Sequence, residues 1–367
     1  MRKLLASFLT LILLPGGLAA QEERPHVIID QIPGMKKVRK VVRGFSAIDS
    51  NYIEPQHYNF SAMVQATFNY DMYWLKSGTG QSVMFSPDVI MRVGPYFGWR
   101  WAFLGYTFEL NHLGFGGSSK KKEVALSLYS SQIGVDLFYR RTGSDYKIRR
   151  VGLGDGVDTR QLQNIDFDGI NVGITGFNLY YIFNHHRFSY PAAFSQSTCQ
   201  KISCGSWMAG LGYTRNSIDL DYDKLKTIVE ARVSPAGSVR LDSGLMFNSV
   251  SYQDFNASVG YAYNWVFARH WLFCASASVA LAYKHTKSEA AENNDHGFKL
   301  DNVNVDGIGR FGLVFNNNHW YSGLSAILHS YNYRKSRFET NNLFGSVNLY
   351  VGCNFGVKKE YRKKKKK

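Results

Sequence analysis

Long stretches in which apolar and polar residues alternate constrain this chain more than any other feature of its sequence. Over residues 58–72 the even positions are apolar or aromatic, whereas most odd positions are Asn, Ser, Gln, Thr or Asp. Successive side chains of a β-strand point to opposite faces, so this period of two predicts one long strand with one apolar face. The pattern returns in residues 255–265, 271–283, 303–315 and 343–357.

Six further segments have strand character, which brings the predicted number to eleven: 82–94, 97–111, 123–141, 169–184, 205–219 and 320–333. Many of these segments run for about 13 to 17 residues. Strands of globular proteins have about 5–6 residues, and strands that cross a membrane need about 9–11. Within 123–141 the parity changes between Leu128 and Ile133, which we interpret as a β-bulge. Strand length therefore favours a membrane β-protein over a soluble one.

The predicted connections are short at one end of the strands and long at the other. The short ones are 94–96 (Gly-Pro-Tyr), 267–270 and 317–319, and the long polar ones are 112–122, 221–250, 285–300 and 334–341. Aromatic residues gather near strand ends: Tyr73 and Trp74, Trp99 and Trp101, Trp265 and Trp271, Trp320 and Tyr321. Both features are typical of outer-membrane barrels.

These features predict an all-β fold: a transmembrane antiparallel up-and-down β-barrel of about twelve strands, within a range of ten to fourteen. Both ends of a bacterial barrel lie on the same side of the membrane, so its strand number is even. The missing twelfth strand is expected at 187–194 or 226–233. The alternative fold is a large soluble β-sandwich, in which the aromatic residues would form the core.

The barrel is expected to span residues 58–357, with distinct segments on either side. Residues 1–20 have the basic start, apolar stretch and small-residue end of a cleaved signal peptide. Residues 21–57 then form a periplasmic segment or linker that contains a basic stretch at 35–43. Residues 358–367 form a periplasmic tail with eight Lys or Arg and one Glu. We hypothesise that both basic segments contact peptidoglycan, anionic lipid or a periplasmic partner.

Of the formal net charge of +15, the tail carries +7 and Arg2 and Lys3 carry +2, which leaves +6 for the rest of the chain. No nucleic-acid-binding pattern accompanies it, so we expect no nucleic-acid partner.

Several stretches also resemble a known family: AIDSNYIEPQHYNF at 47–60, FLGYTFELN at 103–111, FSYPAAFSQS at 188–197, GSWMAGLGY at 205–213 and VGYAYNWVFARHWLF at 259–273. On these stretches the sequence resembles the domain of unknown function 4421 family, predicted outer-membrane barrel proteins of Bacteroides-type bacteria. The resemblance implies a signal peptide and a barrel. It implies no activity.

The motifs that suggest ligand chemistry are weak. Residues 152–158 (GLGDGVD) lack the Gly-Lys-Ser/Thr ending and the helix of a phosphate-binding loop. Residues 164–169 (NIDFDG) begin like a calcium loop but lack its closing Glu, so a turn at a strand entry is the better interpretation. A polar group in one long loop could hold a divalent ion between lipopolysaccharide phosphates, although a solvated loop is favoured: Glu289, Glu292, Asp295 and His296.

Hydrolytic chemistry would need a serine and a histidine in register. Ser189, Ser195, His185 and His186 are near one another in sequence, but no motif places them in a triad. His185 and His186 would point to opposite faces of a strand, which argues against a shared metal. We therefore predict no catalytic residue, no metal ligand and no cofactor. Cys199 and Cys204 are close enough in sequence to form one disulfide, and the sequence leaves that open.

The face opposite the apolar one should line the lumen with polar and charged residues: Asp254, Asn256, Asn264, Lys284, Asn304, Asp306 and Arg310. A barrel of about eight strands is filled by side chains and one of 16–18 strands holds a channel, so twelve leaves both outcomes open. We expect a non-enzymatic protein of the bacterial outer membrane, either a narrow pore or a structural or surface barrel. Outer-membrane lipid, lipopolysaccharide and the barrel-assembly machinery are its expected partners. The alternatives are a barrel enzyme acting on lipid or lipopolysaccharide, and a secreted glycan-binding β-sandwich.

Overall fold

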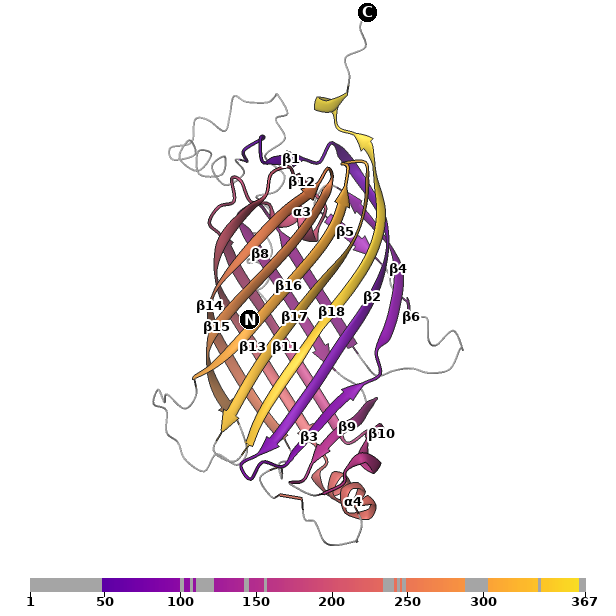
Figure 1. Ribbon diagram of the computed structural model, residues 1–367, viewed down its shortest axis with the longest axis vertical. Coiled ribbons are helices and arrows are strands. Elements are labelled where there is room, and N and C mark those ends of the chain that lie inside the picture. Colours follow the sequence, from indigo (N-terminus) through magenta and orange to yellow (C-terminus); the bar gives the residue numbers. More distant parts are fainter. Residues whose placement is uncertain are drawn as a thin grey trace, which may run out of the picture.

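One antiparallel sheet, curled into a barrel of tilted strands, forms the wall of the molecule (Figure 1). The computed structural model describes residues 48–99, 102–105, 108–109, 122–141, 145–154, 157–233, 241–242, 245, 249–287, 303–335 and 338–362. The predicted signal peptide, the basic stretch at 35–43 and the end of the Lys tail lie outside these ranges. In the described part of the chain, no helix has the length and apolar character needed to cross a membrane.

Twelve wall strands follow one another in the described residues, if two interrupted strands are each counted once. They are β2 (Tyr58–Ser77), β3 (Ser82–Pro87) with β4 (Ile90–Trp99), β5 (Ala102–Gly105) with β6 (Phe108–Glu109), β7 (Lys122–Tyr129), β8 (Ile133–Arg141), β11 (Ile170–Ile182), β13 (Cys204–Leu220), β14 (Ser249–Ala268), β15 (Trp271–Lys287), β16 (Val303–Asn316), β17 (Trp320–Lys335) and β18 (Phe338–Val357). The last strand, β18, pairs with the first, β2, along nearly its whole length, from Phe338↔Ser77 to Val357↔Tyr58.

The outer face of this wall is apolar, as a bilayer requires. Leu211 is 64% exposed and Trp207 is 61% exposed, and large apolar side chains are exposed on most strands. Trp99, Trp265 and Trp320 lie on this face near one end of the barrel. The prediction of aromatic girdles is wrong for Tyr73 and Tyr321, because these side chains point into the barrel, where they are 1% and 2% exposed. A β-sandwich, whose apolar residues would lie between two sheets, does not describe this structure.

The twelfth strand, which was missing from the eleven predicted segments, comes from the segment in which the sequence suggested a β-bulge. Residues 123–141 form two strands, β7 and β8, joined by a tight turn in which Ser130 N donates to Ile133 O over 2.8 Å. Both candidates for the missing strand are wrong, because they contain helices instead: α3 (Tyr190–Phe194) and α4 (Tyr222–Arg232). Asp221 caps α4 by accepting from Lys224 N, and Leu225 and Val229 bury one face of this helix.

Two predicted loops are also wrong. Gly94, Pro95 and Tyr96 lie within β4, paired with β2, and the chain reverses between Trp99 and Ala102 instead. Residues 334–341 do not form a long loop, since β17 and β18 pair as far as Lys335↔Phe338. Both segments are polar or rich in turn residues, but pairing with a neighbouring strand determines their conformation.

The two ends of the barrel differ, as the connection lengths predicted. One end carries the start of β2, the end of β18 and short turns such as that between Ala268 and Trp271. The opposite end carries α4 and the small strands β9 (Tyr146–Gly152) and β10 (Ile165–Asp166), with the 3-10 helix η3 (Arg160–Leu162) between them. We call the first end the terminal rim and the second the loop end.

Candidate functional site

The candidate functional region is the lumen, whose polar lining the alternation predicted. All seven residues expected to face it are buried, with exposed fractions of 8% or less: Asp254, Asn256, Asn264, Lys284, Asn304, Asp306 and Arg310. The strand phase inferred from the sequence is therefore confirmed.

Lys284 on β15 lies between two carboxylates in this lining. Its Nζ is 3.3 Å from Asp254 Oδ2 and 3.1 Å from Asp306 Oδ1, and all three side chains are at most 1% exposed. Lys284 also donates to the carbonyl oxygen of Asn332. The rings of Tyr252 and Tyr331 lie 5.7 and 5.8 Å from its Nζ, within the range of cation–π contacts. A buried ammonium is thus held by charge, hydrogen bond and aromatic faces together.

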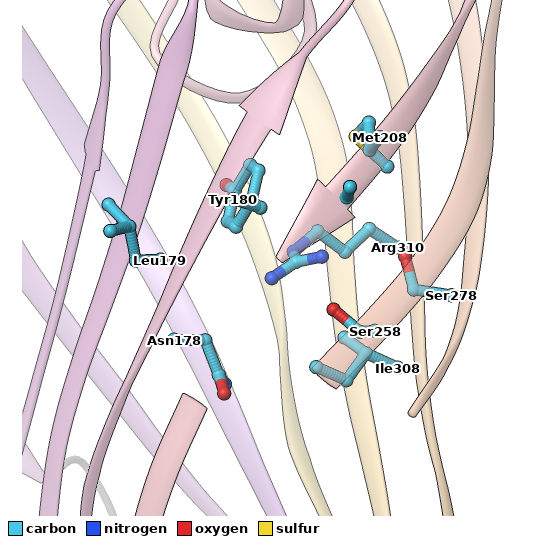
Figure 2. A pocket seen from close by; sticks show the side chains of 9 residues that line it. Asn178, Leu179, Tyr180, Met208, Ser258, Ser278, Ile308 and Arg310 are labelled. Carbon is cyan, nitrogen blue, oxygen red and sulfur yellow. The ribbon is translucent and has the colours of Figure 1, made fainter. Parts of the chain in front are cut away.

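Arg310 forms an ion pair across the lumen. It reaches from β16 to Asp136 on β8, and β11, β13, β14 and β15 lie between these strands in the wall. Its guanidinium lies 5.0 Å from the ring of Tyr180, and Ser127 Oγ donates to the other oxygen of Asp136 over 2.6 Å. Figure 2 shows Arg310 beside Tyr180 at a cavity of about 10 Å³, which is room for about one water molecule.

Aromatic side chains also meet across the lumen. The rings of Phe138 on β8 and His329 on β17 are 5.9 Å apart, and these strands lie on opposite sides of the twelve-stranded wall. Tyr252 on β14 stacks on Tyr333 on β17 at 4.6 Å. Nearby, Arg140 on β8 lies 3.4 Å from Asp71 on β2, whose carboxylate also accepts from Tyr146 Oη over 2.9 Å. Side chains from opposite walls are therefore in contact.

The loop end is closed by apolar packing. One cluster of buried side chains joins the wall strands at this end to β9, η3 and α4. It includes Leu75, Phe85, Ile148, Leu162, Phe167, Ile170, Leu225 and Val229. A core of this kind excludes water from that mouth of the barrel.

The terminal rim is closed by α3, which folds into the barrel from the connection between β11 and β13. Tyr190 Oη donates to Ser276 Oγ over 2.9 Å, and Gln196 Nε2 donates to Tyr350 Oη over 2.7 Å. Gly312 leaves room for this helix, because a Cβ there would lie 3.3 Å from the carbonyl oxygen of Ala193. We call residues 189–200 the plug.

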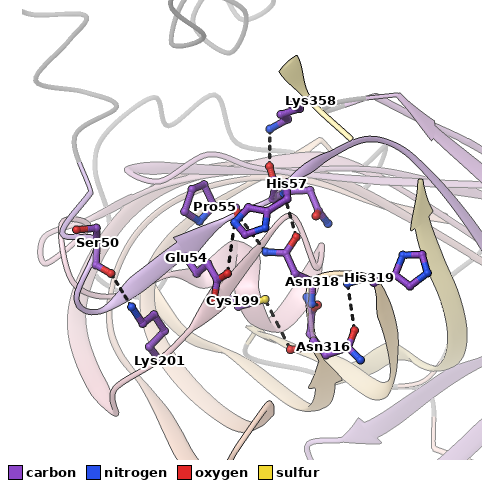
Figure 3. Close-up of polar contacts among 12 residues, drawn as sticks. Ser50, Glu54, Pro55, His57, Cys199, Lys201, Asn316, Asn318, His319 and Lys358 are labelled. Atoms are coloured by element: carbon purple, nitrogen blue, oxygen red, sulfur yellow. Dashed lines mark hydrogen bonds and ion pairs between the residues drawn. The ribbon is translucent and has the colours of Figure 1, made fainter. Parts of the chain in front are cut away.

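A strand that precedes the barrel holds the plug in place. β1 (Ile53–Pro55) pairs with β12 (Thr198–Gln200) in a two-stranded sheet at the terminal rim. Figure 3 shows the side-chain contacts around it: Asn318 Nδ2 donates to Pro55 O over 3.1 Å, and His57 N donates to Asn318 Oδ1 over 2.9 Å. Asn318 has the left-handed backbone (φ 74°) that Asn tolerates in tight turns.

The serines and histidines considered for hydrolysis have structural contacts here. Ser189 Oγ caps α3 and contacts Thr198 Oγ1 at 2.7 Å, and Ser195 Oγ donates to Pro191 O. His185 Nε2 is 2.7 Å from Gln132 Nε2, and burial lowers the pKa of His185. His185 and His186 lie in a turn with their rings 4.0 Å apart, so the expectation of opposite faces is wrong.

The other weak motifs do not gather as ligand sites among the described residues. Asn164 Oδ1 accepts from Arg149, Asp166 is 3.7 Å from Lys147, and Asp168 pairs with Lys224. The hydrogen bond from Lys224 lowers the pKa of Asp168. Asp158 of the 152–158 motif pairs with Arg160, which lowers its pKa to about 2. Glu289, Glu292, Asp295 and His296 lie outside the described residues.

No group of three or more His, Cys, Asp or Glu residues suited to a metal occurs in the ranges that the structure describes. All four cysteines are free, so Cys199 and Cys204 form no disulfide.

The sequence did not single out Asp71, Asp136 and Arg140 as lumen residues. Asp136 and Arg140 both lie on the inward face of β8. Residues 123–141 were interpreted as one strand with a β-bulge, so it was not clear from the sequence which positions of this segment face inward. Asp71 belongs to the polar face of β2, and only the fold shows that it meets Arg140.

The family follows from a match of the sequence to the model of the domain of unknown function 4421 family over residues 47–355. The chain belongs to this family. The matched region begins before β1, ends two residues before the end of β18, and contains every lumen residue described above. A search of curated proteins gives no match.

Several solved structures are similar to this family member, all at low identity. The outer-membrane protease OmpT of Escherichia coli is 7% identical with a TM-score of 0.32, and the alignment covers 82% of this chain and 98% of that chain. The translocator domain of the autotransporter NalP of Neisseria meningitidis is 10% identical with a TM-score of 0.31, covering 87% and 94%. The β-domain of the Bordetella autotransporter BrkA is 12% identical with a TM-score of 0.28, covering 80% and 99%.

Proposed function

We propose that this chain is a non-enzymatic barrel of the bacterial outer membrane that acts as a structural or surface protein and does not conduct solutes. One observation carries the proposal: Arg310 and Asp136, on walls separated by four strands, form an ion pair through the middle of the lumen. The plug at the terminal rim and the apolar cluster at the loop end support it, because each fills one mouth. The hydroxyls of Ser189 and Ser195 are engaged within the plug, which supports a non-enzymatic role.

The terminal rim faces the periplasm in this proposal. Short turns and the chain ends lie on that side in outer-membrane barrels, and the long loops face outward. The barrel-assembly machinery inserts the strands, and lipid and lipopolysaccharide surround the apolar outer face. The tail at 358–367 then lies in the periplasm, where its charge suits peptidoglycan or an anionic partner. Deleting 363–367 should release the protein from sedimented cell wall, and unchanged sedimentation would exclude that role for the tail.

Planar-bilayer conductance of the refolded mature protein tests the occluded lumen. Folding is verified first by a heat-dependent shift in gel mobility. We expect no discrete conductance steps, and reproducible steps from the folded protein would contradict the proposal.

A second variant tests whether the plug alone blocks the lumen. Replacing Tyr190–Phe194 by five Gly or Ser residues removes α3 but keeps the ion pairs of the wall. This variant should also be silent, because Arg310 and Lys284 still fill the central lumen. Conductance from this variant alone would mean that α3 is a gate over an open channel, which the proposal excludes.

A further inference from the structure

A groove on the outer face of the barrel carries an inference about lipid. The groove has a volume of about 830 Å³ and crosses β11, β13, β14, β15 and the start of β16. These strands are neighbours in one wall (Figure 1). The volume is within the roughly 300–1,000 Å³ of small-ligand sites.

The groove exists because a small residue lies between large ones. In the strand register Leu211, Ala257 and Leu281 form one row across β13, β14 and β15. The next row toward the loop end is Tyr213, Phe255 and Tyr283. Ala257 therefore leaves a depression whose sides are apolar side chains, and Leu211 and Leu281 are 64% and 63% exposed. An extended hydrocarbon chain is the ligand that suits such a depression.

A polar row borders the groove on its loop-end side. One step beyond Tyr213, Phe255 and Tyr283, the register aligns Arg215, Gln253 and His285. Neighbouring strands are about 4.8 Å apart, so this row is about 10 Å wide. Arg215 and His285 are exposed, and the side chain of Arg215 has no hydrogen bond or ion pair with another described residue. A free guanidinium is well suited to bind a phosphate group.

Other charged groups on this wall are few. Arg141 on β8 is exposed on the same face, two strands from Arg215. Asp219 is the only acidic residue that faces outward on the described parts of β8, β11, β13, β14 and β15. It lies four residues beyond Arg215, about 13 Å further along the strand. The polar border of the groove is therefore cationic.

We propose that this groove and its polar border bind one molecule of phosphorylated glycolipid from the outer leaflet, the lipid A part of lipopolysaccharide. An acyl chain lies over Ala257, and a phosphate group binds Arg215 beside Gln253, with His285 at the far end of the same row. The orientation comes from the proposed function, in which the loop end faces outward. Lipid A binding is measured in detergent, so the result depends neither on where the protein lies in the cell nor on whether its lumen conducts. Either proposal can therefore fail while the other holds.

Native mass spectrometry of the detergent-solubilised protein tests the proposal, with purified lipid A titrated as the probe. We expect one tightly bound lipid A per chain, and weaker binding of both dephosphorylated lipid A and phosphatidylethanolamine. Arg215→Gln should weaken lipid A binding by about tenfold or more, since a hydrogen-bonded charged partner is lost. Ala257→Phe should weaken lipid A and its dephosphorylated form alike, because it fills the groove.

Two matched controls separate a site from general lipid coating. Lys76→Gln removes an exposed outward charge on β2, and Ala326→Phe enlarges an outward alanine on β17. Both should bind lipid A as the unchanged protein does. Equal binding by all four variants, or equal binding of phosphatidylethanolamine and lipid A, would overturn the proposal. The gel-mobility shift shows that each variant is folded.

Discussion

Replacing Lys284 by methionine should destabilise the barrel more than any other single change at a lumen charge. The side chains of Lys284, Asp254 and Asp306 are at most 1% exposed, and the two N–O distances are 3.3 and 3.1 Å. At an effective dielectric constant of about 20, each contact corresponds to about 5 kcal/mol of Coulomb energy. Desolvation of the three charges offsets much of this attraction. Loss of one member of a buried ion pair costs about 3–5 kcal/mol.

We expect the upper part of that range, because Lys284→Met leaves two carboxylates buried beside each other. The measurement is the free energy of unfolding in guanidinium, followed by far-UV circular dichroism of the refolded barrel in detergent. The exposed Lys76→Met is the matched control and should change this free energy by no more than about 0.5 kcal/mol.

A triple variant separates lost charge from lost packing. Lys284→Met combined with Asp254→Asn and Asp306→Asn keeps similar volumes but carries no charge. It should regain most of the lost stability, since neutral replacement of a buried ion cluster is often neutral or stabilising. A cost below about 1 kcal/mol for Lys284→Met, or no recovery in the triple variant, would refute the role of Lys284 as the counter-ion of both carboxylates.

One labelling measurement and three substitutions test other parts of the structure. Burial raises the pKa of the Cys199 thiol to about 12, so iodoacetamide at pH 8 should label it at least about tenfold more slowly in the folded than in the unfolded protein, by mass spectrometry. Gly134→Ala would bring a Cβ to 2.1 Å from the Tyr180 ring and should cost about 1–3 kcal/mol in the same unfolding assay. Gly307→Ala, whose Cβ would meet nothing within 4 Å, should cost less than about 1 kcal/mol, and equal costs would contradict the packing. Asp221→Ala removes the N-cap of α4 and should cost about 1 kcal/mol, seen as faster hydrogen exchange in Tyr222–Arg232; unchanged exchange would contradict the cap.

The faces of the strands were predictable because a period of two relates sequence position to strand face directly. Lys284, Asp306 and Arg310 were assigned to the lumen on parity alone, and each is buried there. The turn between β7 and β8 was missed because Ser130, Ser131 and Gln132 contain none of the Gly, Pro or Asn that usually mark a turn. The helix α4 was missed because residues 226–233 are too short a window to show a helical period.

The sequence by itself determined that this chain forms a barrel wall with an apolar outer face and a charged lumen, since the alternation along each strand shows which residues face outward and which face inward. It did not determine whether that lumen is open. Arg310 meets Asp136 only because curvature and strand number bring β16 and β8 within reach across the barrel. The plug occupies the terminal rim only because β12 pairs with β1, more than 140 residues earlier in the chain. Such contacts depend on distances between segments remote in sequence, which local alternation does not encode.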